Sequence, residues 1–417
     1  MHVPVVIVGA GPGGLAMSHH LTGAGVDHVV LERGQVGNSW RRERWDSLRL
    51  LTPNWMTALP GYRYVGDDPN GFMSAIDAVE FLDRYSMHFG APIRTGVTVE
   101  SVCRTADGFD VRADHGRWHC DAVVAATGAS SNPRIPALAT EMPRHIDQLT
   151  ALEYRRPAQL AGAGGVLVVG ASASGVQIAD ELRRAGREVT IAVGEHVRLP
   201  RSYRGRDIYW WLDRIGQLDE RYDEVDDIER ARRHASVQLV GNDDRRDLDL
   251  NALRDEGVQI VGRFMAIRGA VGQCSGSLAN LVKNADLKQA RLLRRIDEYV
   301  QDHELVDEVE PVTEASPTLV GNPPTELDLT GCSSVIWATG YRPAFSWLTP
   351  DAIDHRGRVI HDGGVAALPG LYLLGLPFLR RRRSNLIAGL GADATDLFDH
   401  LRAYLDQQAR ARRAVSV

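Results

Sequence analysis

The sequence predicts an α/β fold built from two similar strand–turn–helix units, the second inserted between the two halves of the first. Glycine-rich turns follow apolar strands twice, at Gly9-Ala-Gly-Pro-Gly-Gly14 and at Gly170-Ala-Ser-Ala-Ser-Gly175. Two further apolar strands each stop at an Ala-Thr-Gly triplet, at 126–128 and 338–340. Fully apolar strands that alternate with helices are typical of a parallel sheet covered on both faces.

The first glycine turn has the features of a dinucleotide site. Gly9 permits a sharp turn out of the strand, Gly11 permits close approach of a pyrophosphate, and Gly14 permits close packing of helix on strand. Pro12 is tolerated in the first helical turn, whose free N–H groups favour an anion. Glu32 ends the next strand, where a carboxylate accepts from a ribose hydroxyl. These residues predict a dinucleotide but leave FAD and NAD open.

Composition limits the classes of function. The 417 residues are 44% hydrophobic, which is enough for two or three domains with buried cores. A net charge of −6 argues against nucleic acid or an anionic membrane as partner. The first strand begins at Val3 and no apolar run has membrane-spanning length, so we expect a cytoplasmic protein. The bases are almost all arginine, which indicates a GC-rich bacterial genome.

The four cysteines are scattered and include no C-x-x-C pair. Their spacing therefore predicts neither a zinc site nor a redox dithiol, and it argues against a disulfide reductase. No metal site is expected.

The segment from Gly37 to Met56 is rich in tryptophan and arginine and lacks helical or strand periodicity. Such side chains stack on, or donate to, a flat polar ring system, so we expect this loop along an isoalloxazine ring. Ser39, Trp40 and Arg49 are the best candidates within it. The alternative is an arginine-rich surface loop.

Periodicity predicts further elements along the chain. Amphipathic helices are expected over 74–89 and 286–300, strands over 97–102, 109–113, 189–193 and 371–375, and a polar helical segment over 210–246. A C-terminal helix is expected to open at 389–393 and to run through Leu401. Its N-terminus, near Gly391, would face the carbonyl side of a flavin.

In the second glycine turn Ser172 takes the place of the middle glycine, and its small hydroxyl side chain can donate to phosphate. Arg198, Arg201 and Arg204 lie just beyond the strand at 189–193, where the 2′-phosphate of NADPH would sit. Glu195 is nearer the strand end and would prefer the free hydroxyl of NADH. A solvated arginine loop is the alternative. The run Arg380 to Arg383 either recognises an anionic group or is a solvated surface.

Taken in order, these motifs resemble the class B flavin-dependent monooxygenase superfamily, and most closely its bacterial CzcO-like oxidoreductases and the plant auxin-forming flavin monooxygenases. The resemblance covers nearly the whole chain and rests on GAGPGGLA, Glu32, G-x-S-W at 37–40, LRLLTP at 48–53, GASASG at 170–175, and the ATG and ATGYRP stretches. It implies two Rossmann-like domains: an FAD-binding domain at 1–160 and 316–417, and an NAD(P)H-binding domain with a helical insert at 161–315.

The resemblance also implies cofactor contacts. Those expected for FAD are Gly9, Gly11, Gly14, Glu32, Arg33, Ser39 and Trp40. Those expected for NADPH are Gly170, Ser172, Ser174, Gly175 and an arginine among Arg198, Arg201 and Arg204. Arg49, Thr127, Gly128, Gly340, Gly375 and Gly391 complete the predicted cofactor contacts.

The implied chemistry is reduction of FAD by NADPH, or by NADH, addition of oxygen at the flavin C4a, and transfer of one oxygen atom from the resulting peroxide. The acceptor would be a heteroatom or carbonyl of a small organic substrate. Two alternatives stay open: an FAD oxidase or dehydrogenase of an amine or alcohol, and a flavoprotein redox partner or sensor. Substrate identity and homo-oligomerisation also stay open.

The chain departs from the superfamily at two places. Arg144, Ile146 and Thr150 stand where the F-x-G-x-x-x-H fingerprint is expected, although Tyr154 is retained. The asparagine often found two residues before the flavin-loop proline is replaced by Leu51. Asn54, just beyond that proline, is the candidate catalytic substitute.

Overall fold

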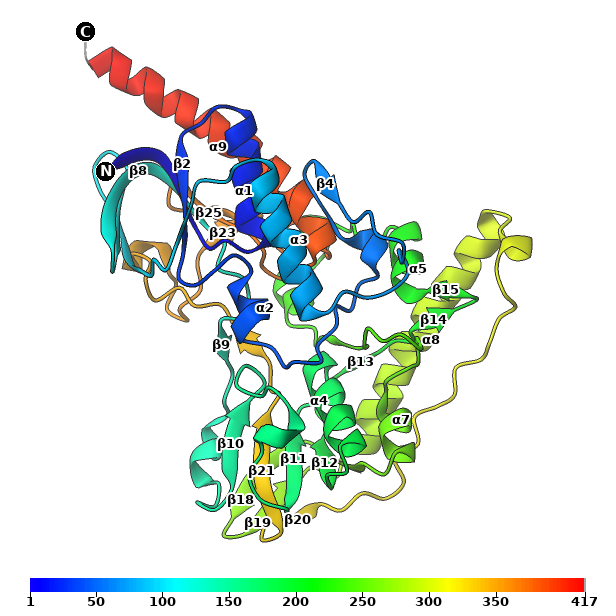
Figure 1. Cartoon of the computed structure of the whole chain (residues 1–417). Coiled ribbons are helices and arrows are strands. Elements are labelled where there is room, and N and C mark those ends of the chain that lie inside the picture. The colour runs from blue at the N-terminus through cyan, green and yellow to red at the C-terminus, as the bar shows by residue number, and fades with distance from the viewer. Residues whose placement is uncertain (416–417) are drawn as a thin grey trace.

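The computed structural model describes residues 1–415. Its two main sheets, each built around parallel strands, lie one above the other in Figure 1. The first sheet has the order β23-β24-β25-β8-β1-β2-β5. Its parallel strands are β1 (His2–Val8), β2 (His28–Glu32), β5 (Ile93–Thr95), β8 (Gly116–Ala125) and β25 (Leu371–Leu373). Val6 on β1 pairs with Val29 on one side and Val123 on the other. Strands buried on both faces explain why this sequence reads as continuous apolar runs.

Helices cover the faces of this sheet. They are α1 (Pro12–Gly23), α3 (Ala75–His88) and α9 (Ile387–Val415), and α1 packs against α9. Ser74 caps α3 through a capping box with Asp77, as the sequence pattern over 74–89 predicts. The C-terminal end of α9, red in Figure 1, extends away from the body of the molecule. β7 (Phe109–Ala113) pairs antiparallel with β8, and β6 (Val99–Arg104) pairs antiparallel with β7, close to the predicted strands.

The second sheet has the order β10-β21-β11-β12-β17, and all its strands are parallel. Its strands are β10 (Asp147–Thr150), β11 (Gly165–Val169), β12 (Val189–Ala192), β17 (Gln259–Val261) and β21 (Cys332–Trp337). The helices α4 (Ala173–Arg184) and α7 (Leu250–Asp255) pack beside it. A small antiparallel sheet joins β18 (Phe264–Arg268), β19 (Val271–Cys274) and β20 (Glu326–Asp328).

The chain passes between the two sheets at β9 (Asn132–Pro133) and β22 (Tyr341–Arg342), which pair antiparallel with each other. The boundaries predicted at 160/161 and 315/316 therefore need correction. β10 precedes the first boundary and β21 follows the second, yet both strands belong to the second sheet. The insertion runs from about β9 to β22. The apolar strand that ends in the second Ala-Thr-Gly triplet lies at the centre of the second sheet.

The expectation of helix over 210–246 is only partly correct. This segment contains the end of α5 (Ile208–Arg214), α6 (Ile228–Arg232) and β16 (Val237–Gln238), and the rest is turns and irregular backbone. α8 (Leu278–Asp302) is longer than predicted and buries Leu293 and Ile296 against α5. The remaining short elements are α2 (Asn38–Arg42), β3 (Ala58–Leu59), β4 (Tyr62–Arg63), β13 (Val197–Arg198), β14 (Ser202–Tyr203), β15 (Arg206–Asp207), β23 (His361–Asp362), β24 (Val365–Ala366), and 3-10 turns at 54–56, 137–141, 157–159, 306–308 and 350–352.

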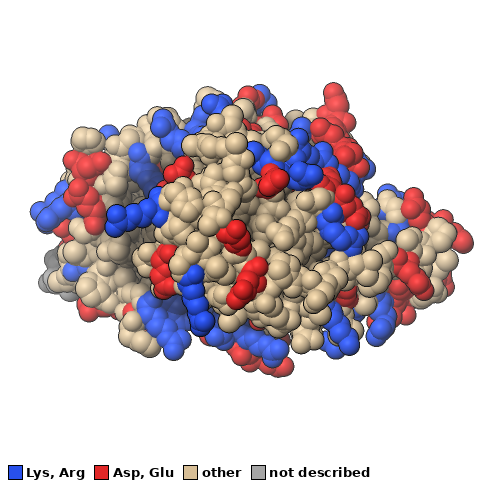
Figure 2. Space-filling view, turned by 90° about the horizontal axis from the view of Figure 1, so that it is seen from below, with Lys and Arg blue, Asp and Glu red and all other residues tan. Residues whose placement is uncertain are grey.

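Figure 2 shows the molecule from below, where basic and acidic side chains are interspersed rather than gathered by sign. None of the helices within residues 1–415 combines the length and apolar character that crossing a bilayer requires.

Candidate dinucleotide sites

The first glycine turn leaves a space in front of α1. Gly9 has φ +106°, and a Cβ at that position would lie 2.7 Å from the carbonyl oxygen of Ala126. A Cβ at Gly14 would lie 1.9 Å from the carbonyl oxygen of Gly9. A Cβ at Gly11 would meet nothing within 4 Å. Gly9 and Gly14 therefore serve packing, whereas Gly11 borders open space at the N-terminus of a helix, where an anion is favoured.

Glu32 is fixed beside this turn. It is 7% exposed, and its Oε2 and Oε1 accept from the backbone N–H groups of Ala10 and Gly34, each at 2.9 Å. Each carboxylate oxygen keeps a lone pair for a further donor such as a ribose hydroxyl. Arg33 and Ser39 lie nearby but both bond to Glu43, Ser39 at 2.9 Å. Both side chains thus already have a hydrogen-bond partner within the protein, and their contact with FAD stays a prediction.

The second glycine turn repeats the geometry of the first. Gly170 has φ +112°, and its Cβ would lie 2.3 Å from the carbonyl oxygen of Ala338. A Cβ at Gly175 would lie 1.9 Å from the carbonyl oxygen of Gly170. Ser172 precedes α4 with φ −88° and ψ −173°, close to the −81° and −178° of Gly11 before α1. The serine hydroxyl bonds to none of the backbone N–H groups at the helix start and stays available to a ligand.

Strand order locates the crevice beside each turn. β1 lies between β2 and β8, and β11 lies between β12 and β21. Because the order reverses at β1/β8 and at β11/β21, the carboxyl ends of these pairs are the expected ligand crevices. Both pairs end at an Ala-Thr-Gly triplet, in which Gly128 has φ +74° and Gly340 has φ +90°. Beyond β21, the hydroxyl oxygens of Tyr341 and Ser174 lie 3.3 Å apart.

Two other predicted contacts end strands near the first crevice. Thr127 has a buried hydroxyl oxygen that bonds to no described residue. Gly375 follows β25 with φ +81°. Neither position is tested as a cofactor contact, and both stay predictions.

The three arginines predicted to hold a 2′-phosphate are used elsewhere, which corrects that prediction. Arg198 is buried and pairs with Asp249 at 2.7 Å and Asp286 at 2.9 Å. Arg201 is fully buried and pairs with Asp207 at 2.6 Å. Arg204 is likewise buried, and its partners are Asp297 and the backbone of Glu310. All three anchor the helical insert.

A different arginine lies at the carboxyl end of β12. Arg263 follows β17, the neighbour of β12, and its Nε is 3.8 Å from where a Cβ of Gly194 would be. Its side chain is exposed and forms no ion pair with any residue among 1–415. Glu195 is also exposed at this strand end. The only signal for Arg263 is spatial, because β17 begins more than sixty residues after β12.

The aromatic and arginine-rich loop connects the two sheets. Its predicted residues Ser39 and Trp40 lie on α2, and Trp40 packs against the core of the first sheet. Arg49 donates to the carbonyl of Phe72 at 2.8 Å and pairs with Asp243 of the insertion at 3.2 Å. The loop is therefore ordered by protein contacts, and its tip bridges the two parts of the fold.

Asn54 lies in the short turn that follows this loop. It is 6% exposed, and its Nδ2 donates to the carbonyl oxygen of Asp68 at 2.9 Å. Its Oδ1 is buried and bonds to no residue in the described part of the chain. The structure shows a tether to the 67–71 turn, and the catalytic role of Asn54 stays a prediction.

Two C-terminal expectations need correction. α9 begins at Ile387, so Gly391 lies in its second turn, against Pro60, and not at the helix start, while its role as a cofactor contact stays a prediction. The arginines at 380–383 are neither a ligand site nor a solvated run, because they pair with acidic side chains of the protein. Their partners are Asp396 for Arg380, Asp393 and Asp396 for Arg381, Glu220 for Arg382, and Asp213 and Asp219 for Arg383.

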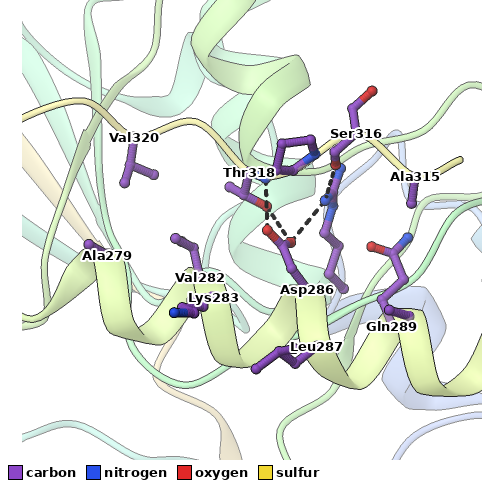
Figure 3. A pocket seen from close by; sticks show the side chains of 13 residues that line it. Ala279, Val282, Lys283, Asp286, Leu287, Gln289, Ala315, Ser316, Thr318 and Val320 are labelled. Atoms are coloured by element: carbon purple, nitrogen blue, oxygen red, sulfur yellow. Dashed lines mark hydrogen bonds and ion pairs between the residues drawn. The ribbon is translucent and has the colours of Figure 1, made fainter.

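A cavity of about 460 Å³ lies away from both glycine turns, between α8 and the strap at 315–320. Figure 3 shows Asp286 joined to Thr318, while the wall of Val282 and Val320 is apolar. A second cavity, about 360 Å³, lies between Trp45, α4 and the 240–246 segment.

The described cysteines are not arranged for disulfide or thiolate chemistry. All four cysteines are free, and only Cys103 is exposed. Burial raises the pKa of Cys120 to about 12, so this thiol stays protonated. Within residues 1–415, no cluster of histidine, cysteine and acidic side chains is suited to a metal ion.

Comparison with known proteins decides the family. The model of the pyridine nucleotide-disulphide oxidoreductases matches residues 6–243. The chain belongs to this family of oxidoreductases. It is 31% identical to an uncharacterized CzcO-like oxidoreductase of Geobacillus kaustophilus, over 96% of this chain and 98% of that protein. The resemblance to CzcO-like proteins expected from the motifs is confirmed.

Two further relatives are monooxygenases by name. Indole-3-pyruvate monooxygenase YUCCA1 of rice is 34% identical over 48% of this oxidoreductase and 50% of that protein. A flavin-containing monooxygenase from Stenotrophomonas maltophilia shares the fold, with a TM-score of 0.67 and 21% identity over 97% and 99% of the two chains. The predicted α/β fold is therefore confirmed.

Proposed function

We propose that this oxidoreductase is an FAD-dependent monooxygenase that uses NADPH and transfers one oxygen atom to a heteroatom or carbonyl of a small organic substrate. The observation that carries the proposal is the pair of glycine turns with matching geometry. Gly11 borders open space, and Ser172, at the equivalent position of the second turn, has nearly the same backbone angles and a hydroxyl that does not cap the helix. Similarity to monooxygenases supports the reaction class. The lack of a cysteine pair among the described residues argues against disulfide reduction.

The residues of the first site fit FAD. The open space at Gly11 suits a pyrophosphate at the N-terminus of α1, and the fixed carboxylate of Glu32 suits a ribose. FAD, when bound, supplies two-electron redox chemistry and reactivity toward dioxygen. The protein supplies placement. Its rigid turn and buried glutamate hold the nucleotide without rearrangement, because their positions are already set by packing and hydrogen bonds.

The residues of the second site fit NADPH. Gly170, Ser172 and Gly175 form the cradle before α4, and the serine hydroxyl would donate to a phosphate oxygen of a bound nucleotide. Arg263 provides the cation for the 2′-phosphate at the end of β12. Glu195 opposes this preference, but its exposure lets its side chain turn to solvent.

Substituting Arg263 tests the choice of nucleotide. For Arg263→Gln we expect NADP⁺ to bind about tenfold more weakly, since a charge-assisted pair is lost, while NAD⁺ binding changes by less than about twofold. Isothermal titration of the FAD-loaded protein with these oxidised nucleotides, which cannot reduce the flavin, measures both. Arg268→Gln, an exposed arginine on the next strand, is the matched control. Equal losses for both nucleotides would remove Arg263 from the 2′-phosphate site.

Labelled dioxygen tests the reaction class. With NADPH and a panel of amines, sulfides, ketones and keto acids, we expect one labelled oxygen atom in a product, detected by mass spectrometry. Substrate-driven bleaching of the flavin without NADPH, together with unlabelled product, would instead support an oxidase or dehydrogenase. The cytoplasmic location predicted from the sequence stays a proposal.

A further inference from the structure

Two arginines without acidic partners lie together beside the second glycine turn. Arg44 lies two residues after α2, in the first part of the chain. Arg155 lies five residues after β10, in the insertion. The Nη1 of Arg155 donates to the carbonyl oxygen of Arg44 at 2.6 Å. Neither guanidinium forms an ion pair with any residue in 1–415, whereas Arg156, Arg184 and Arg246 nearby each do.

The surroundings of Arg44 are costly for an unpaired cation. The residue is only partly exposed, and the one described hydrogen bond of its guanidinium runs from Nη1 to the neighbouring carbonyl of Glu43 at 2.6 Å. Burial lowers the pKa of Arg44, Tyr341 and Glu43 oppose this lowering, and the charge of Arg155 adds to it. An arginine nevertheless stays protonated at physiological pH. A bound anion would offset this electrostatic cost.

Arg44 is held in place rather than mobile. The adjacent Trp45 is 4% exposed and packs in the core of the second sheet. The N–H of Asp46 donates to the carbonyl of Arg155 at 2.8 Å, and the hydroxyl of Ser47 donates to Glu181 of α4 at 2.8 Å. These contacts dock the loop from the first part of the chain onto the insertion and set the position of the guanidinium.

The docking places Arg44 at the crevice between β11 and β21. Its guanidinium carbon lies 5.9 Å from the centre of the Tyr341 ring, and the Tyr341 hydroxyl lies 3.3 Å from Ser174 in the first turn of α4. Tyr341 follows β21, on the side of β11 opposite to β12. Since the adenosine ribose of a dinucleotide lies toward the end of β12, the β21 side receives the other half of the ligand.

We propose that Arg44 and Arg155 bind the nicotinamide-side phosphate of the dinucleotide held on α4, so that a loop of the first domain completes the nucleotide site of the second. The inference rests on the proposed second nucleotide site. The nucleotide phosphate would be the anionic partner that the two neighbouring guanidinium groups do not find within the protein. This arrangement also makes nicotinamide nucleotide affinity depend on a loop outside the glycine turn. Neither residue was found by sequence motifs, because the two lie 111 positions apart.

Binding measurements on the FAD-loaded protein test this without any turnover. For Arg44→Gln and for Arg155→Gln we expect the NADP⁺ dissociation constant to rise about tenfold or more, since each loses charge-assisted hydrogen bonds. Arg44→Lys should recover part of the loss. The fragment 2′,5′-ADP lacks the nicotinamide-side phosphate, so its affinity should be unchanged. Arg42→Gln and Arg156→Gln, exposed arginines close by, are matched controls.

The outcomes separate this inference from the proposed function. If the wild-type protein binds FAD but not NADP⁺, the proposed second site fails and this inference with it. If the wild-type protein binds NADP⁺ and both variants bind it equally well, only the arginine assignment is overturned. Equal weakening of 2′,5′-ADP would also overturn it. The assignment would also be overturned if the variants kept their NADP⁺ affinity but no longer bound phenylpyruvate, used as a keto acid probe. The arginine pair would then bind a substrate carboxylate.

Discussion

The glycines of the first turn have separable roles. A Cβ at Gly14 would lie 1.9 Å from a backbone oxygen, whereas the space at Gly11 is open. For Gly14→Ala we expect a loss of about 1–3 kcal/mol in the free energy of unfolding, because the helix must move from the strand. For Gly11→Val we expect the apoprotein stability to stay near that of the wild type while FAD content falls by about tenfold or more, because the side chain fills the phosphate space.

Urea unfolding of the apoproteins and the visible absorbance of the purified proteins measure the two effects. If Gly11→Val retained FAD like the wild type, the pyrophosphate could not lie at the start of α1. If it unfolded as readily as Gly14→Ala, the two positions would not have distinct roles.

His361 is expected to make stability depend on pH. Burial, followed by the charge of Arg232, lowers the pKa of His361 from 6.5 to about 4, and its Nδ1 accepts from the N–H of Gly364 at 3.3 Å. Asp362 and Glu229 oppose this lowering, and Arg358 adds to it. The folded state therefore binds fewer protons than the unfolded state between these values.

Because the folded pKa is depressed, the contribution of neutral His361 is complete above pH 6.5 and is lost as pH falls toward 4. Melting temperatures of the FAD-loaded protein across this range should fall less steeply for His361→Gln than for the wild type. His355→Gln, at an exposed histidine, should follow the wild-type curve. Parallel curves for all three proteins would contradict the assignment.

At the level of single residues, sequence reasoning succeeded where the chemistry is local. The geometry of both glycine turns depends on neighbours within a few positions and on one adjacent strand. The arginines after β12 were misassigned because their partners are distant, as Asp286 is for Arg198. Arg263 was missed because the pairing of β12 with β17 is invisible in a motif.

At the level of elements, α4 and the docked loop at 44–48 form one contact between the two parts of the fold. Glu181 of α4 accepts from the hydroxyl of Tyr154 at 2.7 Å and from that of Ser47 at 2.8 Å. Tyr154 is the retained member of an otherwise altered fingerprint. Where a histidine was expected, the Thr150 hydroxyl bonds to Glu153 at 2.8 Å and closes a local turn.

Removing the Glu181 carboxylate should loosen this contact. For Glu181→Ala we expect a loss of about 1–3 kcal/mol in the free energy of unfolding, since two donors lose their acceptor and one belongs to the buried Tyr154. Hydrogen exchange should rise over 44–48, while FAD content stays unchanged. Glu188→Ala, at an exposed position beyond the same helix, is the control. Unchanged exchange over 44–48 would show that the loop is held by other contacts.

Elements with a strong local signal were predicted well, as the capped α3 shows. The start of α9 was predicted too late in the chain. The prediction placed the first turn at Gly389, whereas the helix already begins at Ile387, which packs in the core. The 210–246 segment has helical composition, but acidic side chains in its non-helical part serve as partners for distant arginines, as Asp219 does for Arg383. That use is not visible from local periodicity.

At the level of the whole molecule, the antiparallel pair β9–β22 and the docked loop at 44–48 are two of the links between the parts of the fold that carry the glycine turns. The general order of the two units was evident from their glycine turns. The exact crossing points were not, because β10 and β21 join the second sheet through pairings that span most of the insertion.

The central claim is that electrons pass from a nicotinamide nucleotide on the second sheet to a flavin on the first. Anaerobic addition of NADPH to the FAD-loaded protein, followed by visible absorbance, tests it most directly. We predict that the oxidised flavin bleaches with one equivalent of NADPH and that its absorbance returns on admission of oxygen. Retention of the oxidised spectrum by protein that demonstrably binds both nucleotides would contradict the account.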